Sequence, residues 1–375
     1  MSDCWDVVVI GAGIVGVACA LECASRGLRT AIVESRGIGG GATAAGMGHI
    51  VVMDDSPAQM ALTCYSQTLW QDLAERLPNN VEYEPCGTLW VAQDEEEMQE
   101  VRRKSALYAA AGVATVILDS SMLAEAEPHL RQPLAGALLV PSDAVLYPPC
   151  AAGYLLREAL HLGARLYAPR TALSAQVGKV RLDDGTELHA ARIVLGGGTD
   201  AAELLPGLPI RKRKGHLVIT DRYPGFVRHQ LVELGYLKSA HSLTADSVAF
   251  NVQPRSTGQV LIGSSRQYNA EEPAVDAQIL SSMIQRAQWY LPNIGALSAI
   301  RVWTGFRAAT PDKLPLIGPW PGDESLLLAT GHEGLGITTS LGTARLLAGH
   351  LLGEQTQIPI EPYLPARFAR SEAHA

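Results

Sequence analysis

Asp6-Val-Val-Val-Ile-Gly11-Ala-Gly13-Ile-Val-Gly16 joins a short apolar run to three glycines with the spacing G-x-G-x-x-G. The β-branched residues favour a buried parallel strand. Gly11 allows a sharp turn out of that strand, Gly13 lets a phosphate approach the backbone, and Gly16 lets the next helix pack close to the sheet. The segment therefore predicts a strand, turn and helix that bind a pyrophosphate.

The residues after this motif complete the pattern of a dinucleotide site. We expect a helix from Ile14 to Arg26, stopped by Gly27, and a second strand from Thr30 to Val33. That strand ends at Glu34, whose carboxylate can accept hydrogen bonds from ribose hydroxyls and disfavours a 2′-phosphate. A glycine turn in an unrelated α/β domain is the alternative. The register of all these features favours dinucleotide binding and argues against NADP.

The composition describes an acidic globular chain. Its 375 residues can bury a large core and suggest two domains. A net charge of −8 argues against a nucleic-acid partner. The first residues lack the basic region of a secretory signal, and the apolar run Val7 to Leu21 is shorter than the roughly 20 residues that span a membrane. We expect a cytoplasmic protein without a membrane span.

The cysteines of the sequence are scattered, with no C-x-x-C pair among Cys4, Cys19, Cys23, Cys64, Cys86 and Cys150. This spacing offers no zinc or iron–sulfur site, so we predict no metal. Cys19 and Cys23 share a helix face, where small buried side chains in a reducing compartment are the favoured interpretation.

Further glycine-rich segments occur far along the chain. The run from Gly41 to Gly48 is small and apolar, which predicts close approach of the backbone to a flat ligand rather than a mobile linker. The apolar strand Ala191 to Leu195 ends in Gly196-Gly197-Gly198, and Gly331 to Gly336 opens a helix that reaches Leu352. A ligand enclosed by both chain ends is larger than a nicotinamide cofactor and indicates a flavin, whose reduced ring a helix N-terminus stabilises.

The middle of the sequence is rich in expected strands. Helices are expected from Ala58 to Leu77, Asp94 to Ala111, Pro149 to Leu162 and Asp276 to Tyr290, and strands over Val81 to Ala92 (as a pair), Gly136 to Val140, His216 to Thr220, Gln230 to Lys238, Val248 to Gln253 and Val260 to Ser264. The basic run Arg211-Lys-Arg-Lys214 is interpreted as a solvated strand edge rather than a nucleic-acid site.

These motifs give the chain a resemblance to a known family. Val9 to Gly16 with Glu34, Gly41 to Met47, Ile193 to Gly198, Gly305-Phe-Arg-Ala-Ala-Thr-Pro-Asp312 and Gly331-His-Glu-Gly-Leu-Gly336 resemble the FAD-dependent amino acid oxidases and dehydrogenases, which include glycine oxidase, sarcosine oxidase and D-amino acid dehydrogenase. Within that family, the overall likeness is to the catalytic beta subunit of D-hydroxyproline dehydrogenase.

The resemblance implies an α/β (α+β) fold with a Rossmann-like FAD-binding domain and an inserted substrate domain with an antiparallel or mixed sheet. The FAD-binding domain would comprise residues 1–80, 145–205 and 318–375. The substrate domain would comprise residues 81–144 and 206–317. The predicted FAD contacts are Gly11, Gly13, Ile14, Val15, Gly16, Glu34, Ser35, Gly41, Ala42, Thr43, Ala45, Gly46, Met47, Ala172, Gly197, Gly331, Gly334, Leu335, Gly336, Ile337 and Thr338.

The resemblance also assigns substrate-binding residues. Arg307 would clamp the substrate carboxylate, since a planar guanidinium forms a bidentate pair, and Trp303 and Phe306 would lower the dielectric around it. Glycine oxidase-like members have a second arginine where this chain has Gly334, so carboxylate binding would depend on Arg307 alone or on a histidine. The pattern from Gly331 to Gly336 is nearer the D-amino acid dehydrogenase form, which favours a dehydrogenase over an oxidase. His49 is the first candidate for polar contact with the substrate, with a structural bond to local backbone as the alternative. The weaker candidates are His216, Tyr236, His332 and Glu333.

The implied reaction is hydride transfer from the substrate Cα to flavin N5, which gives an imine. The expected substrate is a cyclic D-amino acid, cis-4-hydroxy-D-proline, which would become 1-pyrroline-4-hydroxy-2-carboxylate. The family resemblance implies a hetero-oligomer whose partner subunits carry iron–sulfur or FMN centres, with any attachment to the inner membrane made through those partners. A stand-alone glycine or sarcosine-type oxidase that uses O₂, and a non-catalytic flavin scaffold or electron-relay subunit, are the alternatives.

Overall fold

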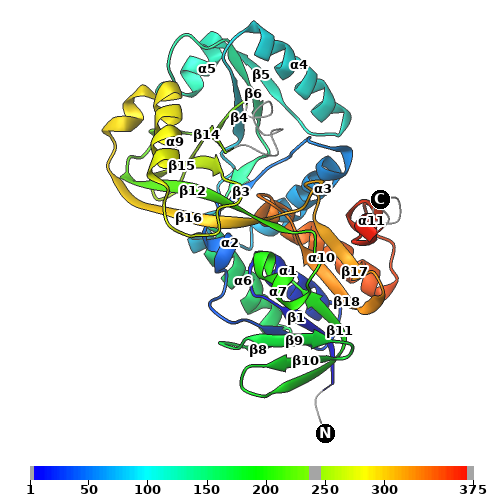
Figure 1. Ribbon diagram of the computed structural model, residues 1–375. Helices are drawn as coiled ribbons and strands as arrows, with labels where there is room; N and C mark the ends of the chain where they lie inside the picture. Colours follow the sequence, from blue (N-terminus) through cyan, green and yellow to red (C-terminus); the bar gives the residue numbers. More distant parts are fainter. Residues whose placement is uncertain (1–3, 236–245, 370–375) are drawn as a thin grey trace.

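The computed structural model describes residues 4–235 and 246–369. The chain builds two large sheets that lie toward opposite ends of the molecule, with the helices α3 (Pro57–Ala74) and α10 (Gly336–Leu352) beside and below their junction (Figure 1). No helix within the described ranges is both long enough and apolar enough to cross a membrane.

The first sheet is mostly parallel and has the order β17-β18-β11-β1-β2-β8. Parallel pairing joins β18 to β11, β11 to β1, β1 to β2 and β2 to β8. The strands of this sheet and of the hairpin attached to β11 are β1 (Cys4–Ile10), β2 (Thr30–Val33), β8 (Arg165–Tyr167), β9 (Ala172–Gln176), β10 (Lys179–Leu182), β11 (Glu187–Leu195), β17 (Leu316–Trp320) and β18 (Asp323–Thr330).

Helices cover one face of the first sheet and a hairpin covers the other. On the helical face, α1 (Ile14–Ser25) packs between α10 and α6 (Pro148–His161), and α3 packs on α10. Val7, Val9 and Ile32 point into this core, whereas Val8 and Ala31 point into a second core under β9 and β10. Because both faces are covered there, the end of β1 from Val7 to Ile10 is apolar and buried throughout, as the sequence predicts.

The second sheet is mostly antiparallel and has the order β16-β12-β15-β14-β13-β4-β6-β5. Helix α9 (Ala277–Tyr290) packs on one of its faces, where Phe250 stacks on Tyr290 with ring centroids 4.2 Å apart. Its strands are β4 (Thr88–Ala92), β5 (Val116–Asp119), β6 (Gly136–Val140), β12 (Arg211–Arg222), β13 (Gln230–Glu233), β14 (Ser247–Pro254), β15 (Gln259–Arg266) and β16 (Ala299–Ala309).

Shorter elements complete the described chain. They are the small strands β3 (His49–Ile50) and β7 (Ala144–Val145), the helices α2 (Gly41–Ala44), α4 (Glu95–Ala110), α5 (Ser120–Ala126), α7 (Ala201–Leu204) and α11 (Ala366–Ala369), and the 3₁₀ turns η1 (Asn79–Val81), η2 (Gly198–Asp200), η3 (Pro292–Ala296) and η4 (Glu361–Tyr363).

The α/β fold class and most expected elements are confirmed, but two segments were misjudged. The expected strand pair Val81 to Ala92 forms a strand only from Thr88, because Pro85 lacks a ladder donor and Gly87 turns the chain at φ +72°. Strand β17 was missed because its flanking prolines indicate a turn, yet it pairs antiparallel with β18. The part of the expected strand Gln230 to Lys238 beyond residue 235 lies outside the described residues.

The interpretation of Arg211 to Lys214 as a solvated edge holds for Arg211 and Lys212, which are exposed, and is wrong for Arg213 and Lys214. These residues belong to β12, which lies between β16 and β15 in the interior of the second sheet. Arg213 and Lys214 are each only 4% exposed. Arg213 is paired with Glu333, and the Lys214 ammonium donates to the Ala274 carbonyl, which satisfies the general need of buried cations for partners.

The strands of the two sheets come from separate parts of the sequence. The first sheet draws on residues 4–33, 165–195 and 316–330, and the second on residues 88–140 and 211–309. The predicted domain boundaries follow the same alternation, and as a division into independent folding units they remain a prediction.

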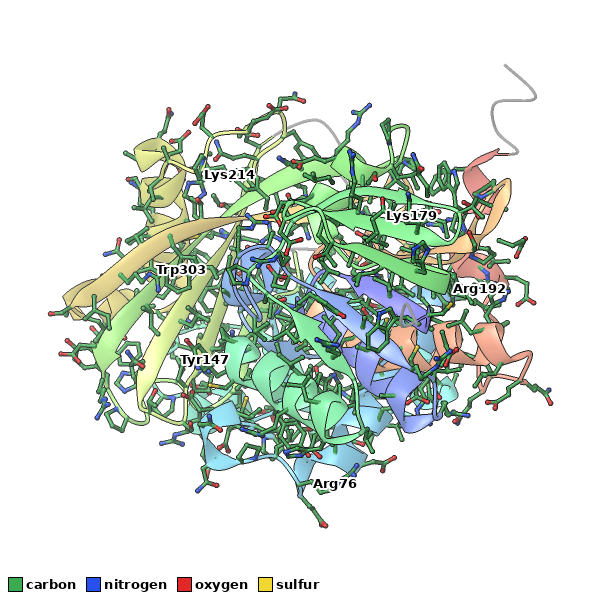
Figure 2. The ribbon with its side chains drawn as sticks, turned by 90° about the horizontal axis from the view of Figure 1, so that it is seen from below. Arg76, Tyr147, Lys179, Arg192, Lys214 and Trp303 are labelled. Atoms are coloured by element: carbon green, nitrogen blue, oxygen red, sulfur yellow. The ribbon has the colours of Figure 1, made fainter. Side chains whose placement is uncertain are left out.

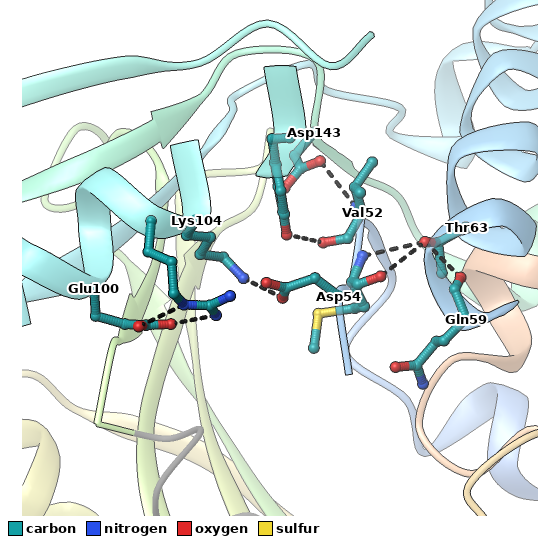
Figure 3. A network of polar contacts seen from close by, with 10 residues as sticks. Val52, Asp54, Gln59, Thr63, Glu100, Lys104 and Asp143 are labelled. Atoms are coloured by element: carbon teal, nitrogen blue, oxygen red, sulfur yellow. Dashed lines mark hydrogen bonds and ion pairs between the residues drawn. The ribbon is translucent and has the colours of Figure 1, made fainter. Parts of the chain in front are cut away.

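A buried polar network ties helix α4 to the segment from Val51 to Asp55 (Figure 3). The Lys104 ammonium pairs with Asp54, and the two side chains are 0% and 3% exposed. Asp143 accepts hydrogen bonds from the Val52 backbone N–H at 3.2 Å and from the Gln67 amide at 2.7 Å. Burial raises the pKa of the Asp143 carboxyl to about 7. This network fixes the segment after β3 in one conformation.

We predict that Lys104→Met lowers the free energy of unfolding by about 3 kcal/mol, because it leaves the buried Asp54 carboxylate unpaired. The double variant Lys104→Met/Asp54→Asn removes both charges and should regain most of this loss. Lys179→Met is the matched control, since Lys179 pairs with Glu187 at the surface (Figure 2) and should change stability by less than about 1 kcal/mol. Urea unfolding followed by circular dichroism measures all three, and a double variant no more stable than Lys104→Met would contradict the argument.

Candidate active site

A cavity of about 910 Å³ opens between the carboxyl ends of β1, β2, β11 and β18 and the second sheet. Ligands of open parallel sheets bind at such strand ends. The predicted site residues that line it are Gly11, Gly13, Ile14, Val15, Glu34, Ser35, Gly41, Ala42, Thr43, Ala45, Gly46, Met47, His49, Ala172, Gly197, Arg307, Gly331, Gly334, Leu335, Gly336 and Ile337. Segments far apart in sequence therefore meet around one space.

The glycine turn after β1 allows three backbone segments to meet closely. Gly11 has φ +105°, and a Cβ there would lie 2.8 Å from the Gly196 carbonyl oxygen. A Cβ on Gly16 would lie 2.0 Å from the Gly11 carbonyl oxygen. Gly16 is absent from the lining of the cavity and supports the turn from behind, which is the packing role that its place in the motif predicts.

Donors and acceptors at the turn match the parts of a dinucleotide. Helix α1 starts at Gly13 without a side-chain cap, so its first N–H groups are available to a pyrophosphate in the cavity. The exception is the N–H of Ile14, which donates to Thr43 Oγ1 at 3.1 Å. The Glu34 carboxylate accepts from the N–H groups of Ala12 at 2.7 Å and Arg36 at 2.8 Å. These bonds hold it at the cavity, where its remaining lone pairs can accept ribose hydroxyls.

The second helix that reaches the cavity is α10. It also starts without a side-chain cap, at Leu335, and its first residues line the cavity. Thr338 lies behind this wall, fully buried, and donates to the His49 carbonyl at 2.9 Å, so it joins α10 to β3. The positive end of a helix beside the cavity suits an electron-rich ring. The residues present therefore fit FAD.

Arg307 lies where β16 borders the cavity. Its guanidinium extends over Gly215 of the neighbouring strand, where a Cβ would come within 2.5 Å of Nη1. Nη1 donates to the Ser265 carbonyl at 3.0 Å. Gly334 lies beside the same side chain, with an added Cβ only 3.7 Å from Nε. A second arginine at that position would place two like charges together, and this chain instead leaves space next to Arg307.

His49 lines the cavity from β3. Burial lowers the pKa of its imidazole to about 4, opposed by a hydrogen bond with the Gly334 backbone and assisted by the Arg307 charge. Its Nδ1 is buried and has no hydrogen-bond partner among the described residues. The backbone contact of the ring is therefore made to Gly334, near the other end of the chain, rather than to the local backbone that we considered as an alternative, and one ring nitrogen is left for a ligand. A neutral ring of this pKa is a hydrogen-bonding group rather than a strong base.

The other side chains proposed from the sequence divide into two groups. His332, Glu333 and Phe306 line the cavity. His216 is fully buried away from it, where Nδ1 contacts Ser265 Oγ at 2.9 Å and Nε2 accepts from the Asp276 N–H at 3.0 Å. Trp303 packs against a small cluster that contains Met47. Trp303 is not among the lining residues, and the effect of Trp303 and Phe306 on the dielectric around Arg307 stays a prediction. Tyr236 lies outside the described residues.

Sequence reasoning missed several lining residues. They are Arg36, Gln59, Trp90, Arg170, Asp200, Lys212, Arg213, Gln230, Asn251, Ser264 and Arg266. Asn251 and Gln230 interrupt otherwise apolar strands, which is a usable signal for a polar lining. For Arg170 and Asp200 the sequence carries no such signal, because their place depends on how loops fold over the cavity.

The fold and the cavity describe a flavin-binding oxidoreductase, and comparison with known proteins gives the family. Residues 6–350 match the model of the DAO family, described as FAD dependent oxidoreductase. The hydrogen cyanide synthase subunit HcnC of Pseudomonas aeruginosa is 27% identical, with 98% of this chain and 97% of the relative covered. Glycine oxidase of Geobacillus kaustophilus is also 27% identical, with 97% of each covered.

Solved structures agree with this assignment. The crystal structure of glycine oxidase from Geobacillus kaustophilus superimposes with a TM-score of 0.86 at 25% identity and covers 97% of this chain and 98% of that one. L-proline dehydrogenase from P. horikoshii shows the same fold, with a TM-score of 0.88 at 23% identity and 99% of each chain covered. The chain belongs to the DAO family of FAD-dependent oxidoreductases, and FAD is its cofactor. The predicted amino acid oxidation is confirmed at the level of this family.

We predict that Gly16→Ala abolishes FAD retention, because the new methyl group would overlap the Gly11 carbonyl and push α1 away from the turn. Gly153→Ala is a matched control, since Gly153 also lies inside a helix, α6, and has no atom within 4 Å of an added Cβ. That variant should keep its FAD and gain up to about 1 kcal/mol in stability. The flavin-to-protein absorbance ratio after gel filtration measures retention. Full FAD content in Gly16→Ala would contradict the assigned packing.

His332 should make stability depend on pH. Its Nε2 lies 2.9 Å from Thr343 Oγ1, and burial lowers the pKa of the ring from 6.5 to about 3. Between these values the unfolded chain takes up a proton that the folded chain does not, so stability falls as pH falls. We predict that His332→Gln reduces the loss of unfolding free energy between pH 7 and pH 5 by about 2 kcal/mol. Exposed His161→Gln should match the wild type in urea unfolding; an unchanged pH dependence in His332→Gln would refute the assignment.

Proposed function

We propose that this protein oxidises the amine of a small cyclic D-amino acid, cis-4-hydroxy-D-proline, to 1-pyrroline-4-hydroxy-2-carboxylate. The observation that carries the proposal is the Arg307 guanidinium, which lies in the flavin cavity beside Gly334, a position without a side chain. A guanidinium in a partly dry cavity binds a carboxylate through two parallel hydrogen bonds. The substrate is therefore an amino acid anchored by its carboxylate.

His49 suits the other polar end of such a substrate. Because its pKa is about 4, the ring is neutral at neutral pH and accepts a hydrogen bond from an amine without adding a positive charge beside it. Oxidation breaks the Cα–H bond and one N–H bond and forms a C=N bond, so the amine must enter the step with a free lone pair. FAD supplies the acceptor for the hydride. The protein's own contribution is to hold the carboxylate and the amine in one orientation.

We also propose that electrons leave through partner subunits that carry iron–sulfur or FMN centres. Support comes from HcnC, whose name describes it as a subunit, and from cysteines that show no iron–sulfur spacing in this sequence. The glycine oxidases among the relatives favour a second candidate, a stand-alone oxidase that reduces O₂ to hydrogen peroxide. The two candidates differ in what reoxidises the flavin.

Anaerobic bleaching of the flavin absorption band tests both. The purified protein receives cis-4-hydroxy-D-proline, D-proline, sarcosine or glycine, and air is then admitted. We expect fast bleaching by hydroxy-D-proline and slow recolouring in air without peroxide. Bleaching by glycine or sarcosine, with fast recolouring and peroxide, would replace the proposal with the oxidase, and no bleaching by any amino acid would indicate a non-catalytic flavin scaffold.

The same assay tests the carboxylate clamp. Arg307→Lys keeps the charge but loses the bidentate geometry, so the substrate concentration for half-maximal bleaching should rise by about tenfold or more. Arg192→Lys is the matched control because Arg192, labelled in Figure 2, is an exposed arginine on β11 that does not line the cavity. Equal behaviour of the two variants would exclude the clamp.

A further inference from the structure

One face of the second sheet is polar where it borders the cavity. Strand side chains alternate between faces, so Leu231 and Phe250 point to the core under α9, whereas Gln230 and Asn251 point the other way. Trp90 of β4 aligns with Val232 of β13, and Val232 aligns with Asn251 of β14. Trp90 and Asn251 therefore lie on either side of Val232 on the middle strand, β13. Gln230 lies two residues before Val232 on the same strand.

Four polar atoms on this wall are buried and have no hydrogen-bond partner among the described residues. They are Trp90 Nε1, Gln230 Oε1, Asn251 Oδ1 and, from α3, Gln59 Oε1. All four residues line the cavity, and Trp90, Gln230 and Gln59 are 2%, 4% and 7% exposed. Buried polar groups are nearly always hydrogen-bonded, so a cluster of unpaired ones at a cavity indicates a ligand. We call these four side chains the polar subsite.

The polar subsite is held in place from behind. The Lys104 ammonium lies 4.3 Å from the centroid of the Trp90 ring, on which it exerts a cation–π attraction, and is paired with Asp54. This contact fixes the plane of the indole and leaves its N–H to the cavity. Gln59 is on the first turn of α3, whose N-terminus Ser56 caps through a bond to the Gln59 N–H at 3.1 Å. A rigid donor and rigid acceptors discriminate between ligands better than mobile ones.

The distance to Arg307 suits a small amino acid. The guanidinium lies over Gly215 of β12, and β15 separates β12 from β14, which carries Asn251. Neighbouring strands are about 4.8 Å apart, so β12 and Asn251 on β14 are separated by roughly 10 Å across the sheet before side chains reach inward. Gln230 on β13 and Trp90 on β4 start one and two strands further from Arg307. A five-membered ring with one polar substituent fits between Arg307 and Asn251.

We infer that the polar subsite binds a hydroxyl group on the substrate ring, remote from the carboxylate. A hydroxyl both donates and accepts, so it can give its hydrogen to an amide oxygen and accept the Trp90 N–H. An unsubstituted ring leaves these groups unpaired and is therefore selected against. The inference rests on the proposed function for the carboxylate anchor at Arg307, and it names Trp90, Asn251, Gln230 and Gln59 as the residues that determine specificity.

The test compares two substrates that differ only in the hydroxyl. Anaerobic experiments measure the second-order rate constant of flavin reduction by cis-4-hydroxy-D-proline and by D-proline. The result compared between variants is the first rate constant divided by the second. Asn251→Leu should lower this ratio by about tenfold. Trp90→Phe keeps the ring and removes only the N–H, so it should lower the ratio in the same direction. Asn293→Leu, at an exposed position, is the matched control and should keep the wild-type ratio.

The outcomes separate this inference from the proposed function. Reduction by both prolines with the same ratio in the wild type, Asn251→Leu and Trp90→Phe would overturn the subsite and leave the proposed function standing. Reduction by neither proline would overturn the proposed substrate. In that case the subsite is tested with cyclopentanecarboxylate and cis-3-hydroxycyclopentanecarboxylate, which lack the amine. The shift in flavin absorption on binding gives the affinity of each ligand. A wild-type preference for the hydroxylated ligand that Trp90→Phe abolishes supports the subsite, and equal affinities refute it.

Discussion

The contact on which the rest of the structure depends is the crossing of α1 over the end of β1. A Cβ at Gly16 would lie 2.0 Å from the Gly11 carbonyl oxygen, and one at Gly11 would lie 2.8 Å from that of Gly196. Without side chains at these positions, the helix start, the β1 turn and the end of β11 converge. The convergence directs the free N–H groups of α1 at the cavity.

The two faces of the second sheet differ, because one packs on an apolar core and the other lines the cavity. Its α9 face buries Phe250, Tyr290 and Met283, and this apolar burial stabilises the sheet. On the cavity face, the Asn251 and Gln230 oxygens have no hydrogen-bond partner within the described part of the chain, and each buried unpaired group costs about 1 to 3 kcal/mol. Apolar burial on the α9 face thus offsets the destabilisation that the unpaired polar groups on the cavity face cause when no ligand is bound.

Local signals explain what the sequence could predict. The glycine spacing, the strand at Val7 to Ile10 and the acidic end at Glu34 are each fixed by neighbouring residues, and the structure places them as expected. Other errors involve pairing between distant segments. Arg213 is typical of a surface residue until β16 pairs beside it and Glu333 reaches it from the other chain end. Trp90 and Asn251 become neighbours only through β13, which no periodicity in either strand reveals.

The distribution of charge links the cavity to its ligands. The whole chain carries a net charge of −8, yet the described residues that line the cavity include more basic side chains than acidic ones: Arg36, Arg170, Lys212, Arg213, Arg266, Arg307 and Lys313 against Glu34, Asp55, Asp200, Glu203 and Glu333. Charges of one sign inside a concave, low-dielectric wall focus the field into the opening. An acidic surface repels anions in general, so a locally cationic cavity concentrates the two anionic groups that belong there, a pyrophosphate at α1 and a carboxylate at Arg307.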